Sequence, residues 1–153
     1  MVYMRLIEGY RKLLNVTESA TLSELKSAYR NLMKDWHPDK FAGDEILLKE
    51  AEDKSKKIIT AYHFLVSISK ETITKTIEAY TETINNAAIV DYEYKSEILR
   101  VVFADETEYE YFGVPKATYV KLVNAETPQR FARRHIFQSY VYRSTSKLVA
   151  TPV

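Results

Sequence analysis

The spacing of the apolar residues changes from a helical to a strand pattern near residue 88. Up to about residue 70 they recur at the three- and four-residue intervals of an α-helix, and from residue 88 they alternate with polar residues as in a β-strand. A chain of 153 residues is long enough for two small domains. We therefore predict two units, a helical one followed by an α+β one.

The composition narrows the class of protein further. Hydrophobic residues make up 46% of the chain, enough for a real core, and the net charge of +1 gives no overall attraction to nucleic acid or membranes. The absence of cysteine excludes disulfides and thiolate metal sites. No stretch approaches the roughly 20 apolar residues of a membrane span, and the first residues do not resemble a signal peptide. We expect a soluble cytoplasmic protein that contacts no membrane.

The helical unit is predicted to contain a hairpin of two long helices. Thr21 lies three residues before Glu24, the spacing of a capping box at a helix start. Pro38 ends this helix, because the residue before a proline is pushed out of helical geometry. A further helix begins after Asp44 and continues toward residue 70. Two helices around a short rigid loop should pack antiparallel, braced by the helix that precedes them.

The loop combines rigid and polar side chains directly after the only tryptophan of the chain, and it consists of His37, Pro38 and Asp39. This loop is either a turn that contains a histidine or the functional site of the molecule. Three basic residues at four-residue intervals form a slanting stripe on the preceding helix, away from its apolar side: Lys26, Arg30 and Lys34. Such a stripe is either a solvated face or a docking surface for an acidic partner.

Residues 10 to 70 resemble a J-domain, the module of DnaJ-type cochaperones. The segment LKSAYRNLMKDWHPDKF resembles the second helix and signature loop of that family, and IITAYHFL resembles the core of its third helix. The resemblance implies an all-α helical hairpin that binds a DnaK-type, ATP-driven chaperone (heat-shock protein 70) and stimulates its ATP hydrolysis. The chain itself would catalyse no reaction.

The same resemblance implies a role for each residue of the loop. Asp39 would offer its carboxylate to an arginine of the chaperone in a bidentate contact. Pro38 would stiffen the loop so that docking costs little entropy, and His37 would orient the loop by hydrogen bonding. The basic stripe would steer the approach of the partner, so affinity should fall with added salt. Two residues depart from the family pattern: Ser55 stands where an aromatic is usual, and Asp35 places an acid within the stripe.

Residues 71–87 are rich in threonine and keep apolar residues at helical spacing, which predicts a helical connector. We therefore expect a J-domain over residues 1–70, this connector, and a second domain over residues 88–153.

The second domain is predicted to contain a three-stranded antiparallel sheet and two helices, followed by a short strand and a loose tail. The helices begin near Pro115 and Pro128. One side of the sheet is acidic, and the other carries Val90, Tyr92, Tyr94, Leu99, Val101, Phe103, Tyr109 and Tyr111. These tyrosines are either a stacking platform for single-stranded nucleic acid or core beneath the two helices. We predict core, because no other face is apolar enough to take those helices.

Residues 88 to 146 resemble the KTSC domain, a small module named for its occurrence at the carboxyl end of some lysyl-tRNA synthetases. The segment LRVVFADETEYEYFGVP resembles its core, with Glu106 and Arg130 in place of two glycines usual in its turns. The resemblance suggests nucleic-acid or client binding by a basic and aromatic cluster outside the acidic sheet face: Arg130, Arg133, Arg134, Tyr140, Tyr142 and Arg143.

The sequence contains no pattern of a metal site, a phosphate-binding loop or a catalytic nucleophile. The three histidines, His37, His63 and His135, lack metal-ligand spacing, and no Gly-rich phosphate loop or nucleophile motif is present. We therefore expect no metal, no cofactor and no enzymatic activity. The sequence predicts a J-domain cochaperone whose second unit selects a protein client. The alternatives are an RNA-binding adaptor that recruits a chaperone, and an interfering protein that occupies the chaperone unproductively.

Overall fold

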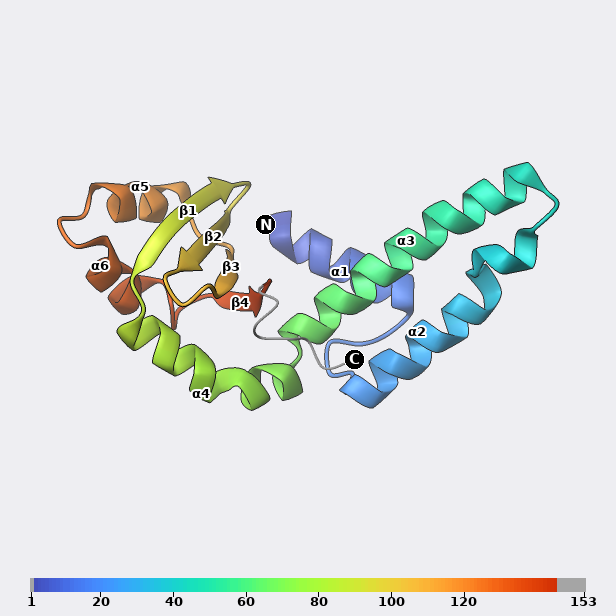
Figure 1. Ribbon diagram of the computed structural model, residues 1–153, viewed down its shortest axis with the longest axis horizontal. Coiled ribbons are helices and arrows are strands. Elements are labelled where there is room, and N and C mark those ends of the chain that lie inside the picture. Colours follow the sequence, from blue (N-terminus) through green and yellow to red (C-terminus); the bar gives the residue numbers. More distant parts are fainter. Residues whose placement is uncertain (1, 146–153) are drawn as a thin grey trace.

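The computed structural model describes residues 2–145, and Figure 1 shows helices in the first part of the chain and a sheet with two covering helices in the second. The first part contains α1 (Val2–Leu14), α2 (Leu22–Trp36), the 3₁₀-helix η1 (Pro38–Phe41), α3 (Glu45–Ile68) and α4 (Lys70–Asn86). The second part contains β1 (Ile89–Lys95), β2 (Ile98–Phe103), β3 (Glu108–Phe112), α5 (Lys116–Asn124), α6 (Pro128–His135) and β4 (Val141–Ser144). This order confirms the predicted fold class. Within residues 2–145 no helix is both long and apolar enough to cross a bilayer.

The predicted hairpin of α2 and α3 is present, and α1 packs against it. Thr21 forms the expected capping box, since its hydroxyl accepts the N–H of Glu24 (3.1 Å) and the Glu24 carboxylate accepts the N–H of Thr21 (3.4 Å). Across the hairpin, the ring of Tyr29 stacks on that of Tyr62 with centroids 4.3 Å apart. The core of this part contains Ile7, Leu14, Leu25, Ala61, Tyr62, Phe64, Leu65 and Val66.

The tip of the hairpin is packed less tightly with apolar groups than its base. Ser55 is only 5% exposed, and its hydroxyl donates to the carbonyl of Glu52 (3.1 Å), which satisfies the buried polar group within the helix. Ile46 and Leu47, in the first turn of α3, remain exposed. The position of the tip therefore depends on the rigidity of the two helices more than on a large core at the tip itself.

A single residue, Ser69, separates α3 from α4. Its N–H donates to the carbonyl of Val66 (3.2 Å), and its hydroxyl accepts the N–H of Thr72 (3.2 Å), so it ends one helix and caps the next. The new helix occupies the segment in which the sequence predicts a helical connector. It contributes Tyr80 and Ile84, each 2% exposed, to the core of the second part.

The sheet has four antiparallel strands in the order β1-β2-β3-β4. The three predicted strands form, and the short segment after α6 adds a fourth strand beside β3. Residues 146–153, which include the predicted tail, lie outside the described residues. The helices α5 and α6 bury Leu122 and Ala132 against the sheet.

The tyrosine side of the sheet is core, as predicted. Tyr109 and Tyr111 are 1% and 0% exposed, and the hydroxyl of Tyr111 lies 2.9 Å from that of Tyr80 in α4. Tyr80 also donates to the carbonyl of Phe137 (2.5 Å). Burial raises the pKa of Tyr109 to about 12, so the ring is neutral over the physiological range.

Val90 is an exception to the predicted alternation, because 60% of its surface is exposed. The pairing of β1 with β2 shifts between Ile89 and Asp91, which marks a β-bulge at Val90. An extra residue in one strand changes which side chains face the core, and Ile89 packs there instead.

A hydrogen-bonded turn joins β2 to β3 and ties it to α4. Asp105 accepts the N–H and the hydroxyl of Thr107 (3.0 and 2.5 Å), and the hydroxyl of Thr83 in α4 donates to its other oxygen (2.7 Å). Burial raises the pKa of Asp105, but these hydrogen bonds outweigh burial and hold it below its ordinary value. Glu106 follows with a φ of 71°, a conformation that favours glycine.

Asp105→Asn should lower the free energy of unfolding at neutral pH by about 1–2 kcal/mol, because an amide accepts these hydrogen bonds less well than a carboxylate. Since the folded pKa is depressed, the carboxylate stabilises the fold above the unfolded pKa of about 3.9 and loses this effect as the pH falls through the folded pKa. The difference between parent and variant should therefore shrink in acid. Urea unfolding at several pH values measures it.

Glu106→Gln is the matched control, because it neutralises the neighbouring exposed carboxylate and should change stability little. A difference between parent and Asp105→Asn that stays constant down to acid pH would contradict the assignment.

Candidate functional site

The loop between α2 and α3 is held in one conformation by its own hydrogen bonds. Its first residue, His37, has an extended backbone (φ −63°, ψ 131°) that ends α2, and Pro38 begins η1 with the fixed φ that a helix start requires. The carbonyl of His37 accepts the N–H of Lys40 (3.0 Å). Nδ1 of His37 accepts the N–H of Asp39 (3.2 Å), so the imidazole orients the turn.

The carboxylate of Asp39 faces solvent, with 92% of the side chain exposed. Its Oδ2 lies 3.5 Å from Nδ1 of His37. Because that nitrogen already accepts an N–H, it carries no proton and the contact is not an ion pair. Both carboxylate oxygens therefore remain available to a donor from another molecule.

The base of the loop is anchored to both helices. The rings of Trp36 and Phe41 lie 6.4 Å apart, and Nζ of Lys54 in α3 lies 5.7 Å above the Trp36 ring. Asp44 caps α3 by accepting the N–H groups of Ile46 and Leu47, both at 3.1 Å. The loop is thus a rigid corner between two packed helices.

The basic stripe lies on α2 and leads to this corner. Arg30 and Lys34 are exposed and Lys26 is half-buried. Within residues 2–145 none of the three forms an ion pair with a carboxylate. Asp35 is exposed beside Lys34, so one negative charge lies next to the stripe.

The residues proposed for the second unit do not form one cluster. Arg130, Arg133 and Arg134 are exposed and share one face of α6, because they are three and four residues apart. Tyr140 is half-buried against the second core. The structure therefore brings the three arginines together but leaves Tyr140 mostly a packing residue.

Tyr142 and Arg143 lie on opposite faces of the sheet. The ring of Tyr142 stacks on that of Tyr80 (centroids 4.0 Å, 12°), and burial raises the pKa of Tyr142 to about 12. The Nε atom of Arg143 lies 3.5 Å from the Glu110 carboxylate, and its guanidinium carbon is 4.8 Å from the Phe64 ring centre. Neither residue is presented to a ligand beside the arginines of α6.

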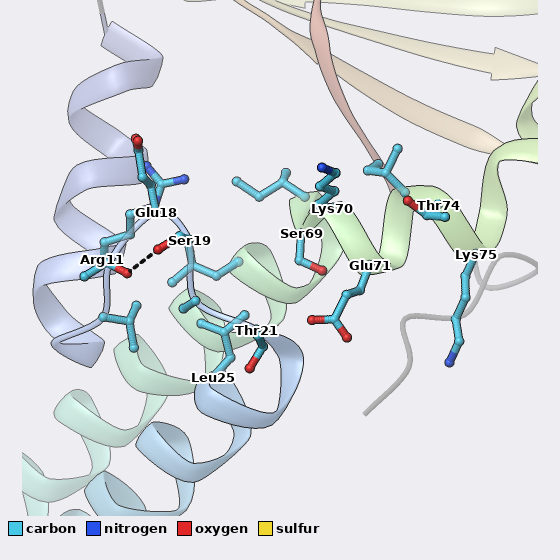
Figure 2. Close-up of a pocket in the computed structure, with 16 residues that line it drawn as sticks. Arg11, Glu18, Ser19, Thr21, Leu25, Ser69, Lys70, Glu71, Thr74 and Lys75 are labelled. Carbon is cyan, nitrogen blue, oxygen red and sulfur yellow. Dashed lines mark hydrogen bonds between the residues drawn. The ribbon is translucent and has the colours of Figure 1, made fainter.

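Two features have no counterpart in the sequence-based predictions. The first is the contact of Phe64 in α3 with the sheet, for which the three consecutive apolar residues 64–66 are a signal, since they occupy more of the helix surface than one apolar stripe. The second is a groove of about 890 Å3 between the α1–α2 loop and the α3–α4 junction (Figure 2). Its floor includes Leu25 and Leu65, and its rim carries charges of both signs, such as Glu71 and Lys75.

No group of three metal-binding side chains was found in the described part of the chain. His37 and His135 are exposed, and the ring of His63 lies 5.4 Å from that of Tyr62. Each histidine therefore has a local environment of its own.

Each part of the chain matches the model of a known domain family. A DnaJ domain model matches residues 10–73, and a KTSC domain model matches residues 85–140. The chaperone protein DnaJ of Deinococcus proteolyticus is 50% identical over 58 residues, which cover 38% of this chain and 17% of that protein. The corresponding protein of Francisella tularensis is 46% identical over 61 residues, covering 40% and 15%.

The chain spans less than a fifth of the length of these curated relatives. The match to the DnaJ model includes the capped helix α2, the corner at residues 37–39 and α3. The match to the KTSC model includes β1, β2, β3, α5 and α6 and ends just before β4. The chain therefore carries a DnaJ domain followed by a KTSC domain.

Proposed function

We propose that this protein is a DnaJ-type cochaperone that docks on a DnaK-type chaperone and stimulates its ATP hydrolysis. In this proposal residues 1–70 recruit the chaperone, residues 88–153 bind a client or partner, and the protein acts in the cytoplasm. The chain itself supplies no catalytic group and needs no cofactor. The observation that carries the proposal is the exposed carboxylate of Asp39 on a corner that its own hydrogen bonds hold rigid.

The geometry supports a specific docking contact. A carboxylate with both oxygens free accepts two parallel N–H donors from one guanidinium, an arrangement that lysine cannot reproduce. The corner is rigid before binding, so little conformational entropy is lost on docking. The unpaired cations of the stripe would attract an acidic surface and raise the association rate.

Asp39→Asn should abolish the stimulation of ATP turnover, because it removes the charge that an arginine of the chaperone would bind. Loss of one partner from a buried charge pair at an interface costs about 2–5 kcal/mol, or at least a 30-fold loss of affinity. Steady-state ATP hydrolysis by a DnaK-type chaperone, with and without the full chain, measures the effect.

Asp35→Asn is the matched control, since it neutralises an exposed carboxylate four residues away and should leave stimulation unchanged or raise it. Equal stimulation by the parent and by Asp39→Asn would rule out this mechanism. Tight binding by the parent without any stimulation would instead favour the interfering role.

The double variant Arg30→Glu/Lys34→Glu should slow association with the chaperone and reduce the dependence of the rate on salt, because both cations are exposed and unpaired. Stopped-flow association at low and high ionic strength measures both quantities. The control is Lys49→Glu/Lys56→Glu, which makes the same change of charge at exposed positions of α3. Equal effects of the two double variants would show that only net charge matters.

An RNA-binding adaptor remains the second candidate, and the arginine face of α6 favours it. Arg130, Arg133 and Arg134 form no ion pair within residues 2–145, so they are available to phosphate groups. If this function holds, a short single-stranded RNA should bind in a salt-dependent manner, and Arg133→Glu/Arg134→Glu should abolish binding. Fluorescence anisotropy with labelled RNA measures it, with Lys49→Glu/Lys56→Glu as the control. No binding by the parent would exclude this candidate.

A further inference from the structure

The outer face of the sheet, opposite the tyrosine core, is partly covered by the DnaJ domain. Phe112 at the end of β3 is 2% exposed and belongs to the same core as Leu14 and Leu25 of the DnaJ domain. Ile98, its partner on β2, packs against that core as well. The face predicted to be acidic is therefore apolar at one end, and this end is an interface within the chain.

Phe64 is the centre of that interface. Its ring contacts Tyr10 of α1 (5.0 Å), Phe112 of β3 (5.4 Å, edge-on) and the guanidinium of Arg143 in β4 (4.8 Å). Two of these three neighbours come from the KTSC domain. Phe64 is only 4% exposed, so its burial depends on both domains.

Arg143 links the interface to the sheet. Burial lowers its pKa, an effect that the nearby Glu110 carboxylate opposes, and the side chain is 23% exposed. Its Nε lies 3.5 Å from Glu110 on the neighbouring strand, while its guanidinium covers the Phe64 ring. The guanidinium of Arg143 therefore makes a cation–π contact with Phe64 of the DnaJ domain. Its charge is balanced by Glu110 within the KTSC domain.

A second contact lies across the groove of Figure 2. The carboxylate of Glu71, in the first turn of α4, accepts the N–H of Leu22 at the start of α2 (2.9 Å). A carboxylate at a helix N-terminus is favoured both by the free N–H groups and by the helix dipole. The bond joins residues 49 positions apart and fastens α4 to the helix that carries the basic stripe.

We propose that the KTSC domain is a rigid brace for the DnaJ domain, so that the two domains form one body. The contacts of Phe64 with the sheet hold α3. Glu71 holds α2 from α4, the helix that lies between the two domains and packs in the second core through Tyr80 and Ile84. These are the two helices that flank the corner at residues 37–39. Figure 1 shows the tip of this hairpin pointing away from the sheet, with α5 and α6 at the opposite end. A chaperone on the corner and a ligand on α5–α6 would then be held at a fixed separation and orientation; only this consequence rests on the proposed function.

The brace is tested by measuring a distance between the domains in the full chain. Because the chain has no cysteine, spin labels attach only where cysteine is introduced. Glu50→Cys in α3 and Lys121→Cys in α5 are exposed positions in the two domains. Double electron–electron resonance should give one distance distribution as narrow as that of a reference pair within the DnaJ domain, Asn31→Cys with Glu50→Cys. A broad or bimodal distribution between the domains would overturn the proposal.

Arg143→Gln and Glu71→Gln should each broaden that distribution, and together they should broaden it more than either alone. The matched control is Arg100→Gln on the same sheet face, because Arg100 pairs with Glu93 and Glu108 inside the KTSC domain. Broadening by Arg100→Gln equal to that by Arg143→Gln would contradict the assignment of the contact.

A second measurement uses Trp36, the only tryptophan, as a reporter in the DnaJ domain. Phe112→Ala, although it lies in the KTSC domain, should lower the urea midpoint of Trp36 fluorescence, whereas Val141→Ala at an exposed position should not. If the Phe112→Ala variant folds and the urea midpoint of its Trp36 fluorescence is unchanged, the two domains do not form one body. Neither measurement involves a chaperone, so a negative result here leaves the proposed function untouched.

Discussion

The packing of α2 against α3 is the interaction on which the rest of the molecule depends. The stacked rings of Tyr29 and Tyr62 and the buried face around Leu25 and Leu65 keep the two helices together. Because the helices are held, Pro38 and the hydrogen bond from Asp39 to His37 form a corner with one geometry instead of a mobile loop. The exposure of the Asp39 carboxylate follows from the sharpness of that corner.

The core of the second domain differs from that of the first because it buries several tyrosine side chains. The ring of Tyr142 lies within about 6 Å of those of Tyr80, Tyr109 and Tyr111, and the hydroxyls of Tyr80 and Tyr111 bond to each other. Tyr80 comes from α4, which lies between the two domains in the sequence. The helix is therefore part of the second core and, through Glu71, also part of the support of the first.

Local rules predicted the hairpin well, since a capping box and a proline act on the residues beside them. The same rules predicted the tyrosine core, because strand alternation assigns every second residue to one face. They failed where contacts join distant segments. The apolar residues 64–66 indicate burial of Phe64, but only docking decides that Phe112 and Arg143 cover its ring. Tyr142 and Arg143 are neighbours in the sequence and belonged to one predicted cluster, yet alternation sends them to opposite faces.

The one-residue junction at Ser69 constrains how this chain can change in evolution. Substitution of Ser69 removes the hydroxyl that caps α4, whereas an inserted residue would turn α4 by about 100° relative to α3. Such a rotation would carry Tyr80 out of its stack and Glu71 away from Leu22 at the same time. Relatives that keep this arrangement of the two domains should therefore vary in the length of their exposed turns and conserve the length of this joint.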